Sequence, residues 1–389
     1  MDFMKEIDIL IFSPVSDVFS KGNATRQDIF HRVNMFAKLK KKVVLIEFIK
    51  SDEEIKNHKI NKFIEVKQIV KKNNRKFIDY KKHGFYSKEE KQKIMALFDV
   101  YRPKIVWFEY DSFFLIILCI KKKYPDILIY IRSHNYEIGH HCEKWKFQNR
   151  KKYIPLASLL RLVVNQIQFI YLYKKVIKYV ESIYCISRVD MKKYQKKFPN
   201  GNWQYLPMYM ERKNQHTVNV EKEVINFVYL SSNLENSVNR EGVLNLIAIA
   251  SRVEHLPVMF HCTGNDIVRS HEKLKNIKYH GYVEKYEDFL NSMDVSVVPS
   301  SIGYGMKGKV YDLLNRGMPS IVSKRVDDVF LGKSKKAYLV CNSIEEWVVA
   351  IEVMLDIKNR KIYSKNAITF MNKNFSKKKY LEILVKYEI

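Results

Sequence analysis

The chain has 389 residues, of which 47% are hydrophobic and 13% aromatic, with only 12 Gly and 9 Pro. This composition supports two α/β cores of ordinary domain size and excludes a disordered or fibrous protein. The 69 Lys and Arg residues outnumber the 42 Asp and Glu residues, which gives a formal net charge of +27. Such an excess predicts attraction to polyanions: nucleic acid, anionic lipid headgroups or phosphorylated substrates.

The cysteines and the N-terminus point to a reducing compartment. The 5 cysteines are scattered and form no CxxC pair, as expected of free thiols. Asp2 and Glu6 stand where a signal peptide carries basic residues. The most apolar stretch, residues 113–120, is shorter than the roughly 20 residues of a bilayer span. We therefore expect a cytoplasmic protein that is soluble or at most peripheral on the inner face of a membrane.

Short apolar runs alternate with longer amphipathic runs in the first half of the chain, which is the pattern of a parallel α/β fold. The expected strands are residues 8–12, 42–47, 105–109, 127–132 and 182–186. Residues 28–39 and 157–180 have apolar side chains at helical spacing and are expected to form helices. Residues 51–90 are rich in Lys and Asn with weak periodicity, so we expect a surface segment with one short strand.

The same alternation starts again after a polar, unpatterned segment at residues 207–220. The expected strands are residues 225–230, 258–263, 277–279, 294–299 and 320–323. The expected helices are residues 242–253, 286–293, 307–316, 344–355 and the basic 376–388. Two consecutive βαβ series predict two Rossmann-like, doubly wound α/β domains with a cleft between them.

The domain boundaries follow from this pattern. We expect an N-terminal domain at residues 1–206, a linker at 207–222 and a C-terminal domain at 223–375. A C-terminal helix in residues 376–389 is expected to pack back on the first domain.

The segment from Pro299 to Pro319 holds the clearest chemical pattern. An apolar strand ends at Pro299, and a Gly-x-Gly loop then opens a helix. Lys307 and Lys309 fall in the first turn of that helix, where each cation is unfavourable by roughly 0.3–1 kcal/mol unless an anion is bound. Asp312 follows about 7 Å further along the axis, so one nucleoside diphosphate could reach both charges. The alternative is a solvated pair of lysines on an ordinary helix.

This segment resembles the donor-binding motif of GT-B glycosyltransferases, especially the family 4 (glycosyl transferases group 1) type, which runs roughly G-x-G-x-K-x-K-V-x-E-A-x-A-x-G-x-P. The resemblance implies that the domain at 223–375 binds the nucleotide sugar and the domain at 1–206 lies on the acceptor side. It also implies that Asp312 holds the ribose hydroxyls and that Gly305, Met306 and Lys307 contact the donor. Asp312 departs from the family's Glu, and Tyr304 replaces a second acidic residue that contacts the donor sugar. A non-catalytic GT-B scaffold is therefore an alternative.

Other segments resemble the same family in the same order. The run from Arg132 to Glu137 follows a strand and is similar to the family's H-N-x-E segment. This resemblance implies that His134 contacts the donor sugar as a catalytic residue and that Arg132 approaches the phosphates. The alternative for His134 is a structural histidine that caps a turn. The resemblance extends donor binding to Gly22, Asn23, Asn233, Arg240, Gly264 and Val283, with Arg240 as a phosphate-binding cation.

We expect the reaction to need no metal. No D-x-D pair follows a strand, and Arg240 and Lys307 would stabilise the leaving diphosphate instead. His140, His141 and Cys142 are adjacent and point in divergent directions, which disfavours a zinc site. Retention of the anomeric configuration is implied by the resemblance alone.

Basic runs in the first half predict a surface that rests on anionic lipid, with the apolar residues of 153–173 among the headgroups. They occur at residues 38–42, 121–123, 150–152 and 192–193. We therefore expect a glycan or lipid-linked glycan acceptor, as in surface polysaccharide assembly. Solvated lysines are the alternative for each run. A nucleic-acid-binding protein is the alternative for the chain, but no known nucleic-acid module is present, so we expect no nucleic acid partner.

Overall fold

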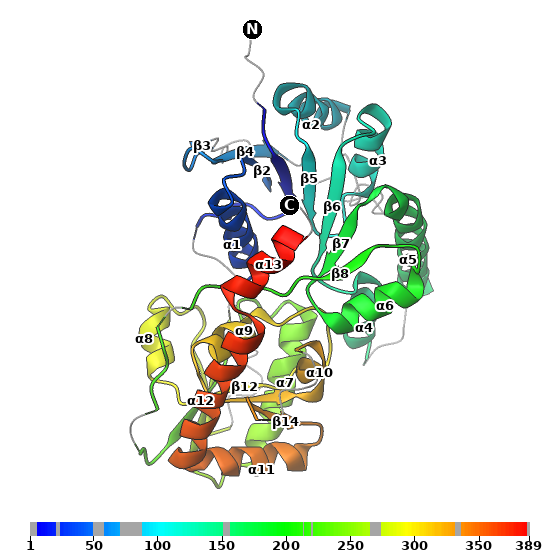
Figure 1. The fold of residues 1–389 in the computed structure, drawn as a ribbon. Coiled ribbons are helices and arrows are strands. Elements are labelled where there is room, and N and C mark those ends of the chain that lie inside the picture. The colour runs from blue at the N-terminus through cyan, green and yellow to red at the C-terminus, as the bar shows by residue number, and fades with distance from the viewer. Residues whose placement is uncertain are drawn as a thin grey trace. The chain divides into compact units, whose positions relative to one another are not determined.

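The computed structural model describes residues 6–20, 24–49, 58–70, 88–150, 156–212, 214–218, 221–264, 274–330 and 336–386. The chain divides into two compact units, each with its own sheet (Figure 1). Unit 1 comprises Met1–Cys142, Lys152–Tyr209 and Tyr380–Ile389, and unit 2 comprises Glu143–Lys151 and Met210–Lys379.

Unit 1 contains an 8-stranded sheet in the order β3-β4-β2-β1-β5-β6-β7-β8. Every pair is parallel except β3 with β4. The strands are β1 Ile9–Ser13, β2 Val43–Ile49, β3 His58–Lys59, β4 Ile64–Val70, β5 Ile105–Glu109, β6 Leu128–Ser133, β7 Ser182–Cys185 and β8 Trp203–Tyr205. The chain builds outward from β1 first to one side and then, from β5 onward, to the other. The strand order therefore reverses between β1 and β5, where doubly wound sheets bind ligands.

Both faces of this sheet are covered by helices. They are α1 Ala24–Lys38, α2 Lys88–Tyr101, α3 Phe114–Lys123, α5 Leu156–Val176, the 3-10 turn Ile177–Tyr179 and α6 Arg188–Lys197. Helix α4, Glu137–Gln148, begins in the part of the chain assigned to unit 1 and ends in the part assigned to unit 2. The C-terminal helix α13, Lys377–Lys386, contributes Tyr380 and Leu384 to the buried cluster that contains Ile9 and Ile11.

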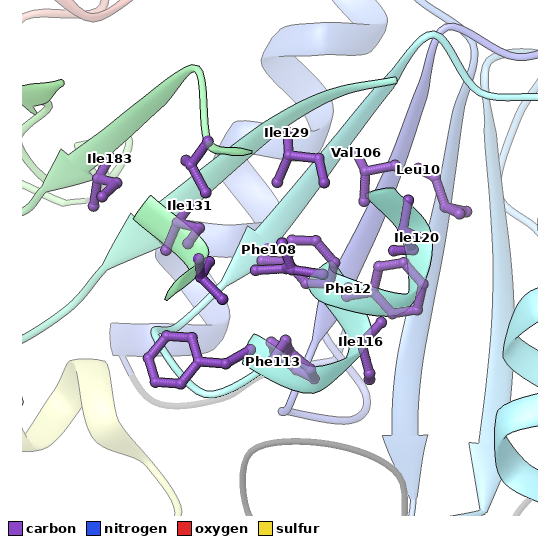
Figure 2. Close-up of a cluster of buried hydrophobic side chains, with 14 of the residues drawn as sticks. Leu10, Phe12, Val106, Phe108, Phe113, Ile116, Ile120, Ile129, Ile131 and Ile183 are labelled. Atoms are coloured by element: carbon purple, nitrogen blue, oxygen red, sulfur yellow. The ribbon is translucent and has the colours of Figure 1, made fainter. Parts of the chain in front are cut away.

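The apolar runs of the strands are continuous because both faces of the sheet are buried. Leu10 and Phe12 of β1 lie on one face, where Phe108 and Phe113 pack with them (Figure 2). Ile9 and Ile11 point the other way and join Trp107 and Phe36 in a second cluster. A run such as residues 9–12 therefore reads as uniformly hydrophobic, and this explains why the sequence signals these strands so clearly.

Unit 2 contains a 6-stranded parallel sheet in the order β11-β10-β9-β12-β13-β14. Its strands are β9 Ile225–Tyr229, β10 Val258–Cys262, β11 Ile277–Tyr279, β12 Val295–Val298, β13 Ser320–Ser323 and β14 Leu339–Cys341. Its helices are α7 Ser237–Arg252, α8 Tyr286–Asn291, α9 Gly308–Asn315, α10 Lys324–Val329, α11 Ile344–Leu355 and α12 Ile357–Asn374. The order reverses between β9 and β12.

The expected α/β class with two Rossmann-like units is confirmed. The expectation of one short strand within residues 51–90 is wrong, because β4 pairs with β2 along seven residues and β3 pairs with β4. β4 alternates apolar and polar side chains, and its partner lies about 20 positions earlier, so the local pattern understates it. Helix α12 was also unforeseen, because its buried positions include the polar Arg360 and Ser364.

Candidate active site

The glycine loop of unit 2 lies at the carboxyl edge of the sheet, between the end of β12 and the start of α9. Gly303 has φ 94 and Gly305 has φ 75, a backbone region that L side chains rarely adopt. A Cβ atom on Gly303 would lie 2.7 Å from the Lys307 Nζ, so the lysine amine packs directly over this glycine. Lys307 is the N-cap of α9, and no side chain caps that position. The loop therefore brings an ammonium group to the positive end of a helix.

Lys309 is the second cation of this turn. Its Nζ donates to the backbone oxygen of Leu230 at 2.7 Å, immediately after β9. The same Nζ lies 4.0 Å from the ring centroid of Tyr229. Burial, with a further contribution from Lys307, lowers the pKa of the Lys309 amine to about 7. The Nζ also donates to Asn239 Oδ1 at 3.4 Å. Its partners are therefore oxygen atoms without charge and an aromatic face, so a bound anion would stabilise its protonated form.

Asp312 takes part in a polar cluster on the exposed side of α9. Its two carboxylate oxygens accept from Tyr286 Oη and Arg316 Nε, both at 3.1 Å. Arg316 also pairs with Glu287, with Nη1 2.6 Å from Oε2. The Asp312 side chain is 19% exposed, so a ribose hydroxyl has access to it but must share oxygens that already accept protein donors. The sequence did not indicate Tyr286 or Glu287, which belong to another helix.

The remaining expected donor contacts of unit 2 lie on loops and helix ends around the same sheet. Arg240 is exposed on the first turns of α7. The side-chain oxygen of Asn233 accepts from the Glu235 N–H at 2.7 Å, so it stabilises its own loop. The Gly264 N–H donates to Gly281 O at 3.0 Å, which joins the loops after β10 and β11.

Two further expected contacts differ in accessibility. Val283 is half-buried in the loop before α8, whereas Met306 is buried within the glycine loop. Val283 is therefore the more accessible of the two to a ligand.

An acidic side chain lies at the glycine loop even though Tyr304 replaces the family's carboxylate. Glu143 Oε2 accepts from the Gly303 N–H at 2.6 Å. Glu143 also pairs with Arg325, whose guanidinium lies 4.6 Å from the Tyr304 ring centroid. Since Glu143 and Gly303 are 160 positions apart, sequence spacing gives no signal for this contact.

In unit 1, an ion-pair network lies where the strand order reverses. Glu109 ends β5, and its two oxygens accept from Arg32 Nε and Nη2, each at 2.7 Å. Arg32 also bonds Asp28 at 3.0 Å and the Tyr380 hydroxyl at 2.8 Å. His134, just after β6, places its Nε2 3.2 Å from Glu109 Oε2. The network therefore fixes the His134 ring through its Nε2 atom.

Tyr110 contacts a face of the His134 ring. Its ring stacks on the His134 ring with centroids 4.2 Å apart and planes 13° apart. Tyr110 has φ 85, which is strained for a residue other than glycine. Its hydroxyl lies 3.3 Å from Thr25 Oγ1. Strain of this kind persists only where the surroundings impose it, so the position of the His134 ring is well determined.

The protonation states follow from this arrangement. Burial alone would raise the pKa of Glu109, but Arg32 and His134 outweigh it and hold that pKa below its ordinary value. Burial lowers the pKa of His134, although Glu109 opposes the shift. Glu109 is therefore ionised and His134 neutral near pH 7, so Nε2–H donates to the carboxylate and Nδ1 is left as an acceptor.

Three expected contacts of unit 1 have a different outcome. The expected approach of Arg132 to the phosphates does not occur in this structure, because its side chain is fully buried. Its guanidinium instead donates to Leu206 O, Pro207 O and Asp28, and so supports the backbone after β8. Gly22 and Asn23 lie outside the described residues.

No group of three or more His, Cys, Asp or Glu side chains in the described residues could hold a metal ion.

One protein-family model matches part of the second unit. Residues 226–356 match the family model described as Glycosyl transferases group 1. The match lies within unit 2 and covers less than half of the chain. None of the curated proteins matches the chain in sequence.

The whole chain resembles several solved structures. Sucrose-phosphate synthase from Thermosynechococcus elongatus has a TM-score of 0.74 at 12% identity, covering 98% of each chain. TarM has a TM-score of 0.69 at 11% identity, covering 100% of this chain and 99% of its own. WaaG, a glycosyltransferase involved in lipopolysaccharide biosynthesis, has a TM-score of 0.64 at 11% identity, covering 97% and 98%. The chain therefore has the GT-B fold.

Proposed function

We propose that this chain is a glycosyltransferase that moves a hexose or related sugar from a nucleoside diphosphate sugar to a glycan or lipid-linked glycan acceptor. The observation that carries the proposal is the turn between Pro299 and α9. Two lysines and two left-handed glycines lie there at the switch point of the sheet, beside a helix N-terminus. A diphosphate suits this combination of ammonium groups and backbone N–H groups.

The chemistry needed from these residues is stabilisation of the leaving group. When the bond between the sugar carbon and the phosphate oxygen breaks, negative charge grows on the diphosphate. Lys307 and Lys309 are positioned at the helix N-terminus to stabilise that charge, and Arg240 is an exposed cation of the same unit. We propose on this basis that the transfer needs no metal ion, because side-chain cations supply the electrostatic effect that a metal supplies elsewhere.

His134 is the proposed catalytic residue of unit 1. Its neutral ring, with Nε2–H bound to Glu109, presents Nδ1 as an acceptor for a sugar hydroxyl. The Arg32 pair keeps Glu109 ionised, so Glu109 is a positioning residue that fixes the tautomer. On α9, Asp312 is the proposed contact for the ribose hydroxyls.

The stereochemistry and the biological setting are further proposals. Retention of configuration is supported by the likeness to a trehalose-6-phosphate synthase, with a TM-score of 0.65 at 9% identity, whose structure was described for glycosyltransfer with retention. The likeness to WaaG supports a role in surface polysaccharide assembly. We place the protein in the cytoplasm, peripheral on the inner face of an anionic membrane, on the strength of its net charge of +27.

Thermal unfolding with UDP, GDP, ADP and CMP, followed by nucleoside diphosphate release from matching sugar donors, tests the proposal. A ligand at 100 times its Kd stabilises the protein by about 2.7 kcal/mol, which is easily detected. We expect one diphosphate to stabilise the chain and release to continue in EDTA. His134→Ala and Asp312→Ala should lower release at least about tenfold, whereas the exposed controls His255→Ala and Asp288→Ala should not.

Two results would overturn the proposal. Stabilisation by a diphosphate without any turnover across the donor panel would identify a non-catalytic scaffold. RNA or DNA binding with a steep salt dependence, and no nucleotide effect, would identify a nucleic-acid-binding protein.

A further inference from the structure

Helix α5 of unit 1 has two apolar faces on opposite sides. One face is buried in the core, through Phe169, Leu172, Tyr173 and Val176. Phe169 and Tyr173 pack edge-on against Phe114 of α3, with ring centroids 5.3 and 5.0 Å apart. In Figure 1, α5 runs along the outer edge of unit 1. This side of the helix behaves as expected for a helix that covers a sheet.

The opposite face is apolar and exposed. Its side chains follow spacings of four, three, four and four residues, which place them on one line along the helix. They are Leu156 (78% exposed), Leu160 (57%), Val163 (44%), Ile167 (62%) and Tyr171 (55%). At 1.5 Å per residue, this line is about 22 Å long. Solvated helices carry polar residues on this face, so a continuous apolar line indicates a contact surface.

The charged residues of α5 and of the 3-10 turn after it are all basic. Residues 156–180 contain no Asp or Glu, and their basic residues are Arg161, Lys174, Lys175 and Lys178. Helical spacing puts Lys174 on the same line as Tyr171, one turn further along, and Lys178 lies in the 3-10 turn that follows the helix. The Lys175 Nζ lies 4.4 Å from the Tyr171 ring centroid. An apolar line that ends in lysines and an aromatic ring is complementary to a membrane with anionic headgroups.

We propose that the exposed face of α5 docks on an anionic phospholipid surface, with the helix lying in the plane of the interface. The aliphatic side chains enter the boundary between headgroups and acyl chains, and the lysines contact the phosphates. This inference goes beyond sugar transfer, because binding to lipid needs neither donor nor acceptor. It assigns one surface to the peripheral location proposed above.

Two other contacts are less favourable for this face. Residues Leu156–Tyr179 are long and apolar enough to cross a membrane by length and composition. A spanning helix, however, would lose the contacts of Phe169 and Tyr173 with α3 and the core. A second copy of the chain would bring together two proteins that each carry a formal charge of +27, whereas an anionic bilayer attracts that charge.

Vesicle sedimentation of the full chain tests the proposal. We expect binding to vesicles of phosphatidylglycerol and phosphatidylcholine, and much weaker binding to phosphatidylcholine alone. Leu160→Ser/Ile167→Ser should weaken the partition at least about tenfold, because burial of each aliphatic side chain drives insertion. The matched control is Val349→Ser/Ile362→Ser in unit 2, where the two side chains are 57% and 55% exposed. The control should bind as the unaltered chain does.

Three measurements separate this surface from its alternatives. Thermal unfolding and nucleoside diphosphate release with a water-soluble acceptor should be the same in both double variants, so a failure of the proposed activity is distinguishable from a failure of docking. Equal binding of the α5 variant and the control would overturn the proposal. So would a dimer in light scattering that the α5 variant abolishes, or membrane association that resists alkaline carbonate and needs detergent.

Discussion

Unit 1 and unit 2 differ in the partners that they provide for cationic side chains. In unit 1 the guanidinium groups of Arg32 and Arg132 meet the carboxylates of Asp28 and Glu109, and all four side chains are fully buried. In unit 2 the Lys309 amine is held by the Leu230 carbonyl oxygen and the Tyr229 ring. The first arrangement is electrically balanced and serves the structure. The second is stabilised by an added anion, which is the property of a ligand site.

The charge balance of unit 1 is tested by Arg32→Met. The substitution leaves Glu109 and Asp28 buried beside fewer cations, so the free energy of unfolding should fall by about 3–5 kcal/mol. Denaturation by urea measures this. The exposed Arg252→Met at the end of α7 is the matched control and should change stability by no more than about 0.5 kcal/mol. A loss below about 1 kcal/mol for Arg32→Met would show that the network does not support unit 1.

Asp111 is the buried carboxyl of unit 1 whose hydrogen-bond donors are hydroxyls, from Ser133 and Tyr194 at 2.7 Å and Tyr173 at 3.3 Å. Burial, with Glu137 nearby, raises its pKa to about 7. A raised folded-state pKa gives stability that is complete below the unfolded value, near 3.8, and is lost as the pH rises through about 7.

The variant Asp111→Asn cannot ionise and should therefore remove this dependence. Relative to the unaltered chain, it should gain roughly 4 kcal/mol between pH 4 and pH 8, from about three pKa units at 1.36 kcal/mol each. Urea titrations at five pH values measure the two curves. Parallel curves would mean that Asp111 is ionised in the folded protein, and that hydroxyl donors balance a buried charge as well as arginine does.

For unit 2 we expect Lys309→Met to have the opposite outcome from Arg32→Met. Stability should change by less than about 1 kcal/mol, because the lost hydrogen bond is offset by removal of a buried amine. Affinity for a nucleoside diphosphate should fall about tenfold to a hundredfold, since a charge-assisted hydrogen bond contributes roughly 1.5–3 kcal/mol. The exposed Lys285→Met is the control for calorimetric titration. Unchanged affinity with lower stability would make Lys309 a structural residue.

The sequence predicted most strands of both sheets because these strands are buried on two faces and read as unbroken apolar runs. It also located the turn from Pro299 into α9, since glycines, lysines and helix spacing are local signals. The sequence could not show which side chains form ion pairs with the buried charged residues. Glu109 and Arg32 are 77 positions apart, and Arg132 and Asp28 are 104 apart, so only the folded chain reveals that Arg132 is structural.

The exposed line on α5 shows a similar limit. Helical periodicity identified the helix, but an apolar line facing solvent and an apolar line facing the core have the same spacing. Leu160 and Phe169 are both apolar residues of α5, but Phe169 lies on the side that packs on the core and Leu160 lies on the side that faces solvent. The sequence therefore predicted apolar residues near a membrane without showing which of them are accessible.

Calorimetric titration of the unaltered chain with a nucleoside diphosphate and with its parent nucleoside tests the anion site most directly. Because Lys307, Lys309 and the start of α9 are expected to hold the phosphates, the diphosphate should bind at least about a hundredfold more tightly than the nucleoside. Equal affinities for the two ligands, or heat from neither across UDP, GDP and ADP, would contradict the account.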